Sequence, residues 1–171
     1  MDFHELLNSR KSIRAFDRNK TIPTKLLERI LRAGQLAPSA RNQQPWRFHV
    51  VQSTSLRQQL CRAYKRDWLQ SAPCLLVVSG KRSEAWGRNS DGYNSLETDL
   101  TIAMDHMILA AAYEGIGSCW IAAFDPDIVK ITLMLDEEEV VFAFTPLGFA
   151  APGEEGKPKQ RKELAEIVRY L

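Results

Sequence analysis

Apolar residues recur along the chain at intervals that alternate between the helical and the strand-like period. Phe3 to Asn8 is predicted to form a short helix, because Asp2 and Glu5 have the spacing of a capping box. A second helix is expected to begin near Pro23 and to end at Pro38. Its apolar face would consist of Leu26, Leu27, Ile30, Leu31 and Gly34.

Four segments are predicted to be strands. Trp46 to Val51 alternates loosely between apolar and polar residues, and Val140 to Leu147 is an apolar segment that ends at Gly148. Cys74 to Val78 is a continuous apolar run, which suits a central strand buried on both faces. A shorter strand is expected over Ser118 to Ala123.

Three further helices are predicted among these strands. The first follows Ser53 or Thr54 as its cap, and the last is opened by Asp125 and Pro126. The segment from Leu96 to Tyr113 is apolar around much of its circumference, which indicates a core helix. The other positions that define these helices are Leu56, Leu60 and Ala63 in the first, and Gly115 or Gly117 at the end of the core helix.

Polar segments interrupt this pattern in three places. Lys81 to Ser95 is expected to be a mobile excursion from the fold, of the kind that can form a lid. Pro152 to Lys162 is rich in Gly, Pro, Glu and Lys and leads into a short helix or strand over Leu164 to Leu171. The acidic run Asp136 to Glu139 is interpreted as a solvated helix end, because charge runs usually face water.

The interleaved helices and strands, with no repeat or linker, predict one domain over residues 1–171 built as an α+β (α/β) sandwich around a mixed sheet. Hydrophobic residues make up 44% of the chain and its net charge is +2, with the cations scattered, so we expect no nucleic-acid partner. No apolar run approaches the roughly 18 residues of a membrane span. The acidic start lacks the apolar core of a signal peptide, and we therefore expect a cytoplasmic protein with no membrane partner.

No nucleophile or metal site is recognisable in the chain. The three histidines and three cysteines have none of the spacings of zinc ligands. A Walker loop, a complete GxGxxG fingerprint and a GxSxG elbow are also missing. An enzyme of this sequence would therefore take its reactivity from a cofactor rather than from a metal. The cysteines, Cys61, Cys74 and Cys119, are expected to be buried as small hydrophobic residues.

A cluster of basic and hydroxyl side chains follows the first helix. Arg10, Ser12 and Arg14 lie at alternate positions, so an extended segment would project them from one face, where they could clamp a phosphate or a polar ring. The alternative is a solvated basic turn. A second basic cluster near the C-terminus could converge on the same phosphate or remain solvated; it consists of Lys157, Lys159, Arg161 and Lys162.

The loop from Pro38 to Trp46 has an unusual run of three amide side chains, Asn42, Gln43 and Gln44. Each amide offers both a hydrogen-bond donor and an acceptor, which is what reading the edge of a heterocycle requires. The alternative interpretation is an ordinary polar loop that leads into a strand.

Four blocks stand out when the chain is read in order: RKSIRAF at 10–16, APSARNQQPW at 37–46, GIGSCWIAAF at 115–124 and KQRK at 159–162. Together they resemble the nitroreductase family of FMN-dependent oxidoreductases, and the resemblance covers essentially the whole chain. It implies a nitroreductase-like fold with a central mixed, mainly antiparallel sheet flanked by helices. It also implies an intertwined homodimer with two FMN molecules at the subunit interface.

The resemblance carries over a set of flavin contacts. The first block would contact the phosphate, the ribityl chain and the pyrimidine edge, and the second would reach the same flavin from the partner subunit. The backbone of the third block would lie near flavin N5, and the fourth would hold the phosphate. In that order, the implied residues are Arg10, Lys11, Ser12 and Arg14; Pro38, Ser39, Asn42 and Gln44; Ala122 and Ala123; and Lys159 and Arg161.

The implied chemistry is hydride transfer from NAD(P)H through flavin N5 to a nitroaromatic, a quinone or a similar small-molecule acceptor, in a ping-pong mechanism. Arg14 would support the anionic reduced flavin electrostatically, with no indispensable side-chain acid. Many relatives carry an acidic residue where this chain has Ala122. Two alternatives remain: a specialised flavin enzyme, such as a dehalogenase or a flavin-fragmenting enzyme, and a flavin-binding protein without turnover.

Overall fold

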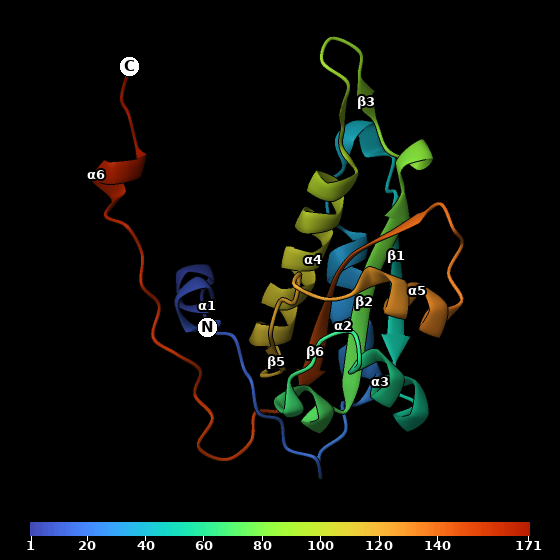
Figure 1. Cartoon of the computed structure of the whole chain (residues 1–171). Helices are drawn as coiled ribbons and strands as arrows, with labels where there is room; N and C mark the ends of the chain where they lie inside the picture. The colour runs from blue at the N-terminus through green and yellow to red at the C-terminus, as the bar shows by residue number, and fades with distance from the viewer.

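Four antiparallel strands form the central sheet of the computed structural model, which describes residues 1–171 (Figure 1). Their order is β1-β2-β6-β5, with β1 at Trp46–Val51, β2 at Cys74–Lys81, β6 at Glu139–Gly148 and β5 at Gly117–Ser118. A single parallel bridge, Ser12 to Ser118, adds the N-terminal segment to this sheet. The mixed, mainly antiparallel sheet is therefore confirmed.

Strand β2 occupies the interior of the sheet, as its continuous apolar run predicts. Residues 74–78 have no exposed surface, because helices cover both faces of the strand. Along β2, Gly80 lies opposite Trp46 of β1, and Cys74 lies opposite Leu147 of β6. The strand expected over Ser118 to Ala123 is wrong beyond Ser118, because the chain then leaves the ladder except for one bridge at Ile121.

Two long helices cover one face of the sheet: α2 at Thr24–Gln35 and α4 at Leu96–Tyr113. Helix α4 has the bounds that its apolar sequence predicts, and Gly115 follows it with φ +73°, as a left-handed cap requires. Pro23 is the N-cap of α2 rather than its first residue. The core on this face includes Ile30, Leu76, Val78, Leu100, Met104 and Met107.

Shorter helices cover the opposite face: α3 at Thr54–Leu60, η2 at Asp67–Ser71 and α5 at Pro126–Leu133. Helix α5 begins as predicted, with the Asp125 carboxylate accepting from the amide of Asp127 at 3.0 Å. Helix α3 ends before Ala63, and Ser53 caps it without a side-chain hydrogen bond. Cys61 is only half-buried at the end of α3, whereas Cys74 and Cys119 are buried as expected.

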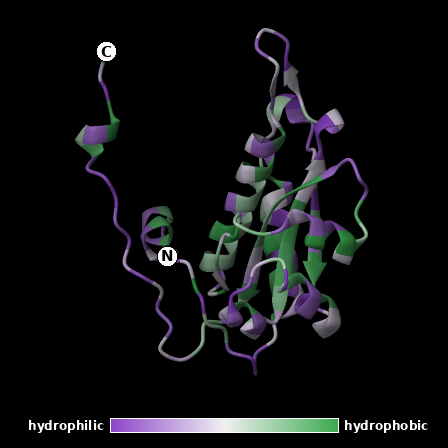
Figure 2. Ribbon diagram, in the orientation of Figure 1, coloured by the Kyte–Doolittle hydropathy of each residue, from purple (hydrophilic) through white to green (hydrophobic).

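The two ends of the chain extend from this body. Helix α1, Phe3–Ser9, has both bonds of the predicted capping box. The tail leaves the sheet, runs to the short helix α6 at Leu164–Ile167 and ends far from the helical layers (Figure 1). Figure 2 shows green, apolar positions in α6 beyond a mostly polar stretch. Leu164, Ile167 and Tyr170 are all more than 60% exposed, so their own chain does not cover the apolar residues of the tail. No helix of the structure has the length and apolar character needed to cross a membrane.

The polar segment over Lys81 to Ser95, predicted as a mobile excursion, contains a hairpin. After β2 come a turn of 3-10 helix, η3 at Arg82–Glu84, and the strands β3 at Gly87–Arg88 and β4 at Tyr93–Asn94. Arg47 holds Glu84 through two bonds of 2.7 and 2.8 Å, and Arg82 pairs with Glu97 of α4. Ion pairs therefore tie the base of the hairpin to β1 and α4, which its composition alone does not reveal.

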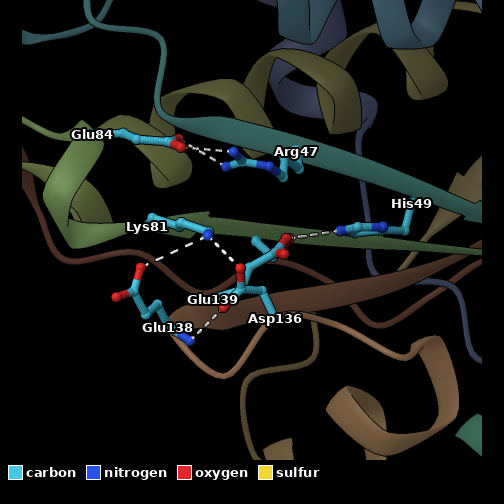
Figure 3. A network of polar contacts seen from close by, with 8 residues as sticks. Arg47, His49, Lys81, Glu84, Asp136, Glu138 and Glu139 are labelled. Atoms are coloured by element: carbon cyan, nitrogen blue, oxygen red, sulfur yellow. Dashed lines mark hydrogen bonds and ion pairs between the residues drawn. The ribbon is translucent and has the colours of Figure 1, made fainter.

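A polar network crosses the sheet below this hairpin (Figure 3). The Ser79 hydroxyl donates to Glu139 Oε1 at 2.5 Å, and His49 Nε2 lies 2.7 Å from Ser79 Oγ and 3.3 Å from the same carboxylate oxygen. Glu139 is only 5% exposed, so the solvated interpretation of the acidic run is wrong for this residue. His49 Nε2 faces both Ser79 and Glu139, and the Ser79 hydroxyl already donates to Glu139. The network therefore ties β1, β2 and β6 together, and Ser79 is not arranged as a nucleophile that His49 activates.

Gly80 is the point where the sheet approaches the loop before β1 most closely. A Cβ at this position would lie 2.1 Å from the Pro45 carbonyl oxygen. Gly80→Ala is therefore expected to lower the free energy of unfolding by about 1–3 kcal/mol, measured by urea denaturation. Gly87→Ala is the control, because its Cβ would meet nothing nearer than 4.0 Å. Equal changes in the two variants would contradict this prediction.

Candidate functional site

The N-terminal basic segment is extended and lies along β5. Ser12 bridges to Ser118 in parallel, and the Ile13 amide donates to the Ser118 carbonyl at 2.9 Å. Gly117 permits this approach, since a Cβ there would lie within 2.9–3.0 Å of the Ile13 side chain. Burial raises the pKa of the Cys119 thiol, while Arg14 and Ser12, which lie beside it, oppose the rise. The segment therefore has the extended backbone under which Arg10, Ser12 and Arg14 would project from one face.

The two basic clusters of the sequence meet in space. Partial burial lowers the pKa of Lys159, and the nearby positive charges of Arg10, Arg161 and Lys11 lower it further. The Lys159 ammonium donates to the carbonyl of Leu7. None of these four cations forms an ion pair with a carboxylate. Such a group of crowded, uncompensated cations is suited to bind an anion.

The tail comes close to the N-terminal segment because of Gly156. This residue has φ +69°, and a Cβ on it would lie 2.8 Å from the Lys11 Cβ and 3.1 Å from the Ser12 carbonyl oxygen. Arg14 is exposed and lines a hollow of about 350 Å³ with residues 153–157. The glycine thus places the C-terminal cations beside the N-terminal ones, although some 150 residues separate them in sequence.

The amide-rich loop contains a one-turn 3-10 helix, η1 at Ala40–Asn42, and three strained residues. Arg41, Asn42 and Gln44 have φ values of 51°, 56° and 51°, in the left-handed region that non-glycine residues avoid. Each such residue costs about 1–3 kcal/mol, and such strain is concentrated at functional sites. The Ser39 hydroxyl oxygen accepts from the Gln44 amide at 2.9 Å and helps to hold this conformation.

Asp99 is the residue of this site that sequence reasoning missed. It lies in the first turn of α4 and is only 1% exposed. One carboxylate oxygen accepts from the Ala40 amide at 2.9 Å, and the other accepts from the Ser95 hydroxyl at 2.7 Å. Ser95 Oγ in turn accepts from the Trp86 amide at 3.2 Å. A single acidic residue on the otherwise apolar buried face of the helix was the available signal.

The structure does not bring the loop and the N-terminal segment together within one chain. The loop leads into Trp46, which lies opposite Gly80, whereas the Ser12–Ser118 bridge lies at the level of Leu147 and Cys74. The six residue steps from Cys74 to Gly80 span roughly 20 Å of strand. The two predicted half-sites therefore lie at opposite ends of the sheet.

The remaining predicted residues lie between these ends or at the surface. Ala122 and Ala123 are exposed and follow Ile121, which bridges to Phe144 in the middle of β6. Pro38 is exposed where α2 ends. A hollow of about 510 Å³ lined by Arg18, Arg57 and Cys61 contains none of the predicted residues. The structure brings together no group of three potential metal ligands among His, Cys, Asp and Glu.

Comparison with known proteins gives consistent matches. The chain matches the family model described as Nitroreductase family over residues 7–70 and 57–149. A relative from Archaeoglobus fulgidus, named as a candidate NADH dehydrogenase/NAD(P)H nitroreductase, is 29% identical over 95% of this chain and 88% of its own. An iodotyrosine deiodinase from Thermotoga neapolitana is 27% identical over 98% of this chain and 96% of its own.

Two solved structures share the fold. A nitroreductase family protein from Clostridium difficile 630 has a TM-score of 0.89 at 29% identity, with 99% of this chain and 98% of that one covered. A candidate NAD(P)H:FMN oxidoreductase from Staphylococcus epidermidis has a TM-score of 0.87 at 21% identity, with 99% and 96% covered. The second likeness concerns the fold alone.

Removal of the Asp99 carboxylate should loosen the loop that it anchors. Asp99→Ala leaves the Ala40 amide without its partner and is expected to cost about 1–3 kcal/mol of unfolding free energy. Hydrogen exchange at Ala40 should accelerate more than exchange within β2. Asp105→Ala, on the same helix but exposed, is the matched control. Unchanged exchange at Ala40 in the Asp99 variant would remove Asp99 from this role.

Proposed function

The chain belongs to the nitroreductase family, and from that premise we propose that it is an FMN-dependent oxidoreductase using NAD(P)H. The acceptor would be a nitroaromatic, a quinone or a similar small molecule. The observation that carries the cofactor assignment is the group of four cations around Lys159, none of which forms an ion pair. A phosphate monoester at this position would relieve the mutual repulsion of the four charges.

The residues present fit an FMN molecule in two halves. Arg10, Lys11, Lys159 and Arg161 would hold the phosphate, while Ser12 and Arg14 continue along the same extended segment. The strained loop would supply the amides of Asn42 and Gln44, each able to donate to and accept from a heterocycle edge. When bound, the flavin would take hydride from NAD(P)H and deliver it to the acceptor.

The side chains of this protein would act by binding and by electrostatics. The Arg14 guanidinium is exposed and forms no ion pair, so it is free to face the negative charge of a reduced isoalloxazine. No carboxylate or histidine belongs to the proposed set of contacts. We therefore expect no side chain to be indispensable as a proton donor, and water would serve that purpose.

Association of two chains would complete the site. In a twofold dimer, the N-terminal segment of each protomer would meet the loop of its partner. The symmetry would thus create two equal sites. The extended tail supports this arrangement, because its exposed apolar residues Leu164, Ile167 and Tyr170 need a surface that their own chain does not provide. A homodimer with two FMN molecules is the assembly that we propose.

Dehalogenation is the second candidate function. It is favoured by the iodotyrosine deiodinase from Thermotoga neapolitana, whose similarity extends over 98% of this chain. The two functions differ in product: a dehalogenase would release iodide from iodotyrosine under reducing, anaerobic conditions. Iodide release measured beside nitroaromatic reduction distinguishes them. A flavin-binding protein without turnover would show neither reaction.

The protein is expected to bind FMN and to accept hydride from a nicotinamide. Purified or reconstituted with FMN, it should be yellow, and anaerobic NADH or NADPH should bleach the visible flavin absorbance. The spectrum before and after titration is the measurement. A colourless protein that cannot be reconstituted would contradict the proposal, and bound flavin that neither nicotinamide reduces would support the non-catalytic alternative.

Mixed dimers test whether each site takes its halves from two chains. Arg14→Ala should weaken FMN binding about 10- to 150-fold, because it removes a charge-assisted contact. Asn42→Gly removes the amide but suits the left-handed backbone. A mixed dimer carries Arg14→Ala on one chain and Asn42→Gly on the other. One of its sites would then contain both substitutions and the other would contain neither, so the dimer should bind one FMN tightly.

If both halves of a site came from the same chain, this mixed dimer would contain no intact site. Titration of FMN into the separately tagged and purified heterodimer measures the stoichiometry. Arg18→Ala, which alters an exposed cation outside the proposed contacts, is the control and should bind two FMN per dimer.

A further inference from the structure

The strained loop and the hairpin form the two walls of an open groove. It has a volume of about 620 Å³ and is lined by Arg41 and Gln43 from the loop and by Trp86, Arg88 and Asn89 from the hairpin. Figure 1 shows the hairpin at the upper end of the sheet, which is where β1 begins after the loop. Arg41 and Gln43 are direct chain neighbours of Asn42 and Gln44, so the groove and the proposed flavin contacts share one loop.

The charge of this groove is positive because its neighbouring carboxylates are already occupied. Asp91 pairs with Arg88 at 2.7 Å, and Glu84 pairs with Arg47 at 2.7 Å. Asp99 is buried and accepts from the loop and from Ser95. Arg41 forms no ion pair, is exposed and shares the groove with no acidic residue. Its guanidinium is therefore available for an external anion.

One wall of the groove is aromatic, and both walls are tied to the same buried carboxylate. The Trp86 ring is half-buried and packs edge-on against Tyr93, with 6.4 Å between centroids. Arg88 lies 4.8 Å above the Tyr93 ring, which fixes this surface further. Asp99 binds the loop at Ala40 and reaches the Trp86 amide through Ser95. The backbone on both sides of the groove is thus held in place before any ligand arrives.

We propose that this groove binds the acceptor and selects planar aromatic molecules that carry an anionic group, with Arg41 pairing the anion and Trp86 packing against the ring. The proposal rests on the proposed function, because it places the acceptor beside the flavin. It adds a preference that the family assignment does not contain. Arg41 is a specificity residue in this scheme, since it would contact the substrate and not the cofactor.

Two nearly isosteric acceptors test the preference directly. The flavin-loaded protein is assayed with 4-nitrobenzoate, which is anionic, and with 4-nitrobenzamide, which is neutral, at saturating nicotinamide. Arg41→Ala should lower kcat/KM for 4-nitrobenzoate about tenfold, which is the scale of one charge-assisted contact at an exposed site. The same variant should lower kcat/KM for 4-nitrobenzamide less than about threefold. Arg41→Lys should restore part of the loss, whereas Arg41→Gln should not.

Arg62→Ala is the matched control, because Arg62 is an exposed cation outside the groove. Equal losses on both acceptors, or no loss on either, would overturn the proposal. Flavin content is measured in every variant, and a loss of flavin in Arg41→Ala would assign Arg41 to the cofactor instead and overturn it as well.

A separate binding measurement distinguishes failure of this proposal from failure of the proposed function. Calorimetric titration of 4-nitrobenzoate and 4-nitrobenzamide into the protein does not require turnover. Tighter binding of the anion that disappears in Arg41→Ala supports the groove even if the protein reduces neither compound. Equal binding of both compounds by the wild-type protein overturns the groove even if the flavin is present and reduced by NADH.

Discussion

Burial of β2 on both faces is the constraint on which the rest of this structure depends. Its residues 74–78 are fully enclosed, and each large apolar side chain among them contributes about 1.5–3 kcal/mol by leaving water. Because helices must cover both faces and neighbouring strands both edges, segments that bind ligands can lie only at the ends of the sheet or on its outer strands. The loop therefore lies at the Gly80 end, and the basic N-terminal segment lies on β5 near the Cys74 end.

The strained loop depends in turn on a second buried group. Three residues with left-handed backbone within a stretch of four are unfavourable in isolation, so tertiary bonds must compensate for them. Asp99 supplies one of them at Ala40, and a buried carboxylate loses much more free energy without its donors than an exposed one does. The same side chain reaches the hairpin through Ser95. The position of the loop and that of the hairpin are therefore not independent properties of this fold.

The sequence predicted best those elements whose signal is local. The apolar run of α4 and the alternation of β1 gave the observed bounds, and the capping box at Asp2 is present. It predicted poorly what depends on distant partners: Asp99 binds Ala40 across 59 residues, and Glu139 binds Ser79 across 60. Polar composition concealed the hairpin of residues 87–94 because ion pairs, not apolar burial, hold its base. Convergence of the two basic clusters was one of two alternatives that the residues left open, and the family resemblance favoured it.

Strain in the loop and repulsion around Lys159 have the same consequence for assembly. Each half-site raises the free energy of the lone chain, one through backbone conformation and the other through crowded charge. A phosphorylated heterocycle that contacts both halves would relieve the repulsion and use the strained amides, but only where two protomers meet. Ligand binding and dimerisation would then stabilise each other by mass action, since the ligand binds the associated form in preference to the single chain. Because the sheet separates the two halves, cofactor binding and association would then be one process.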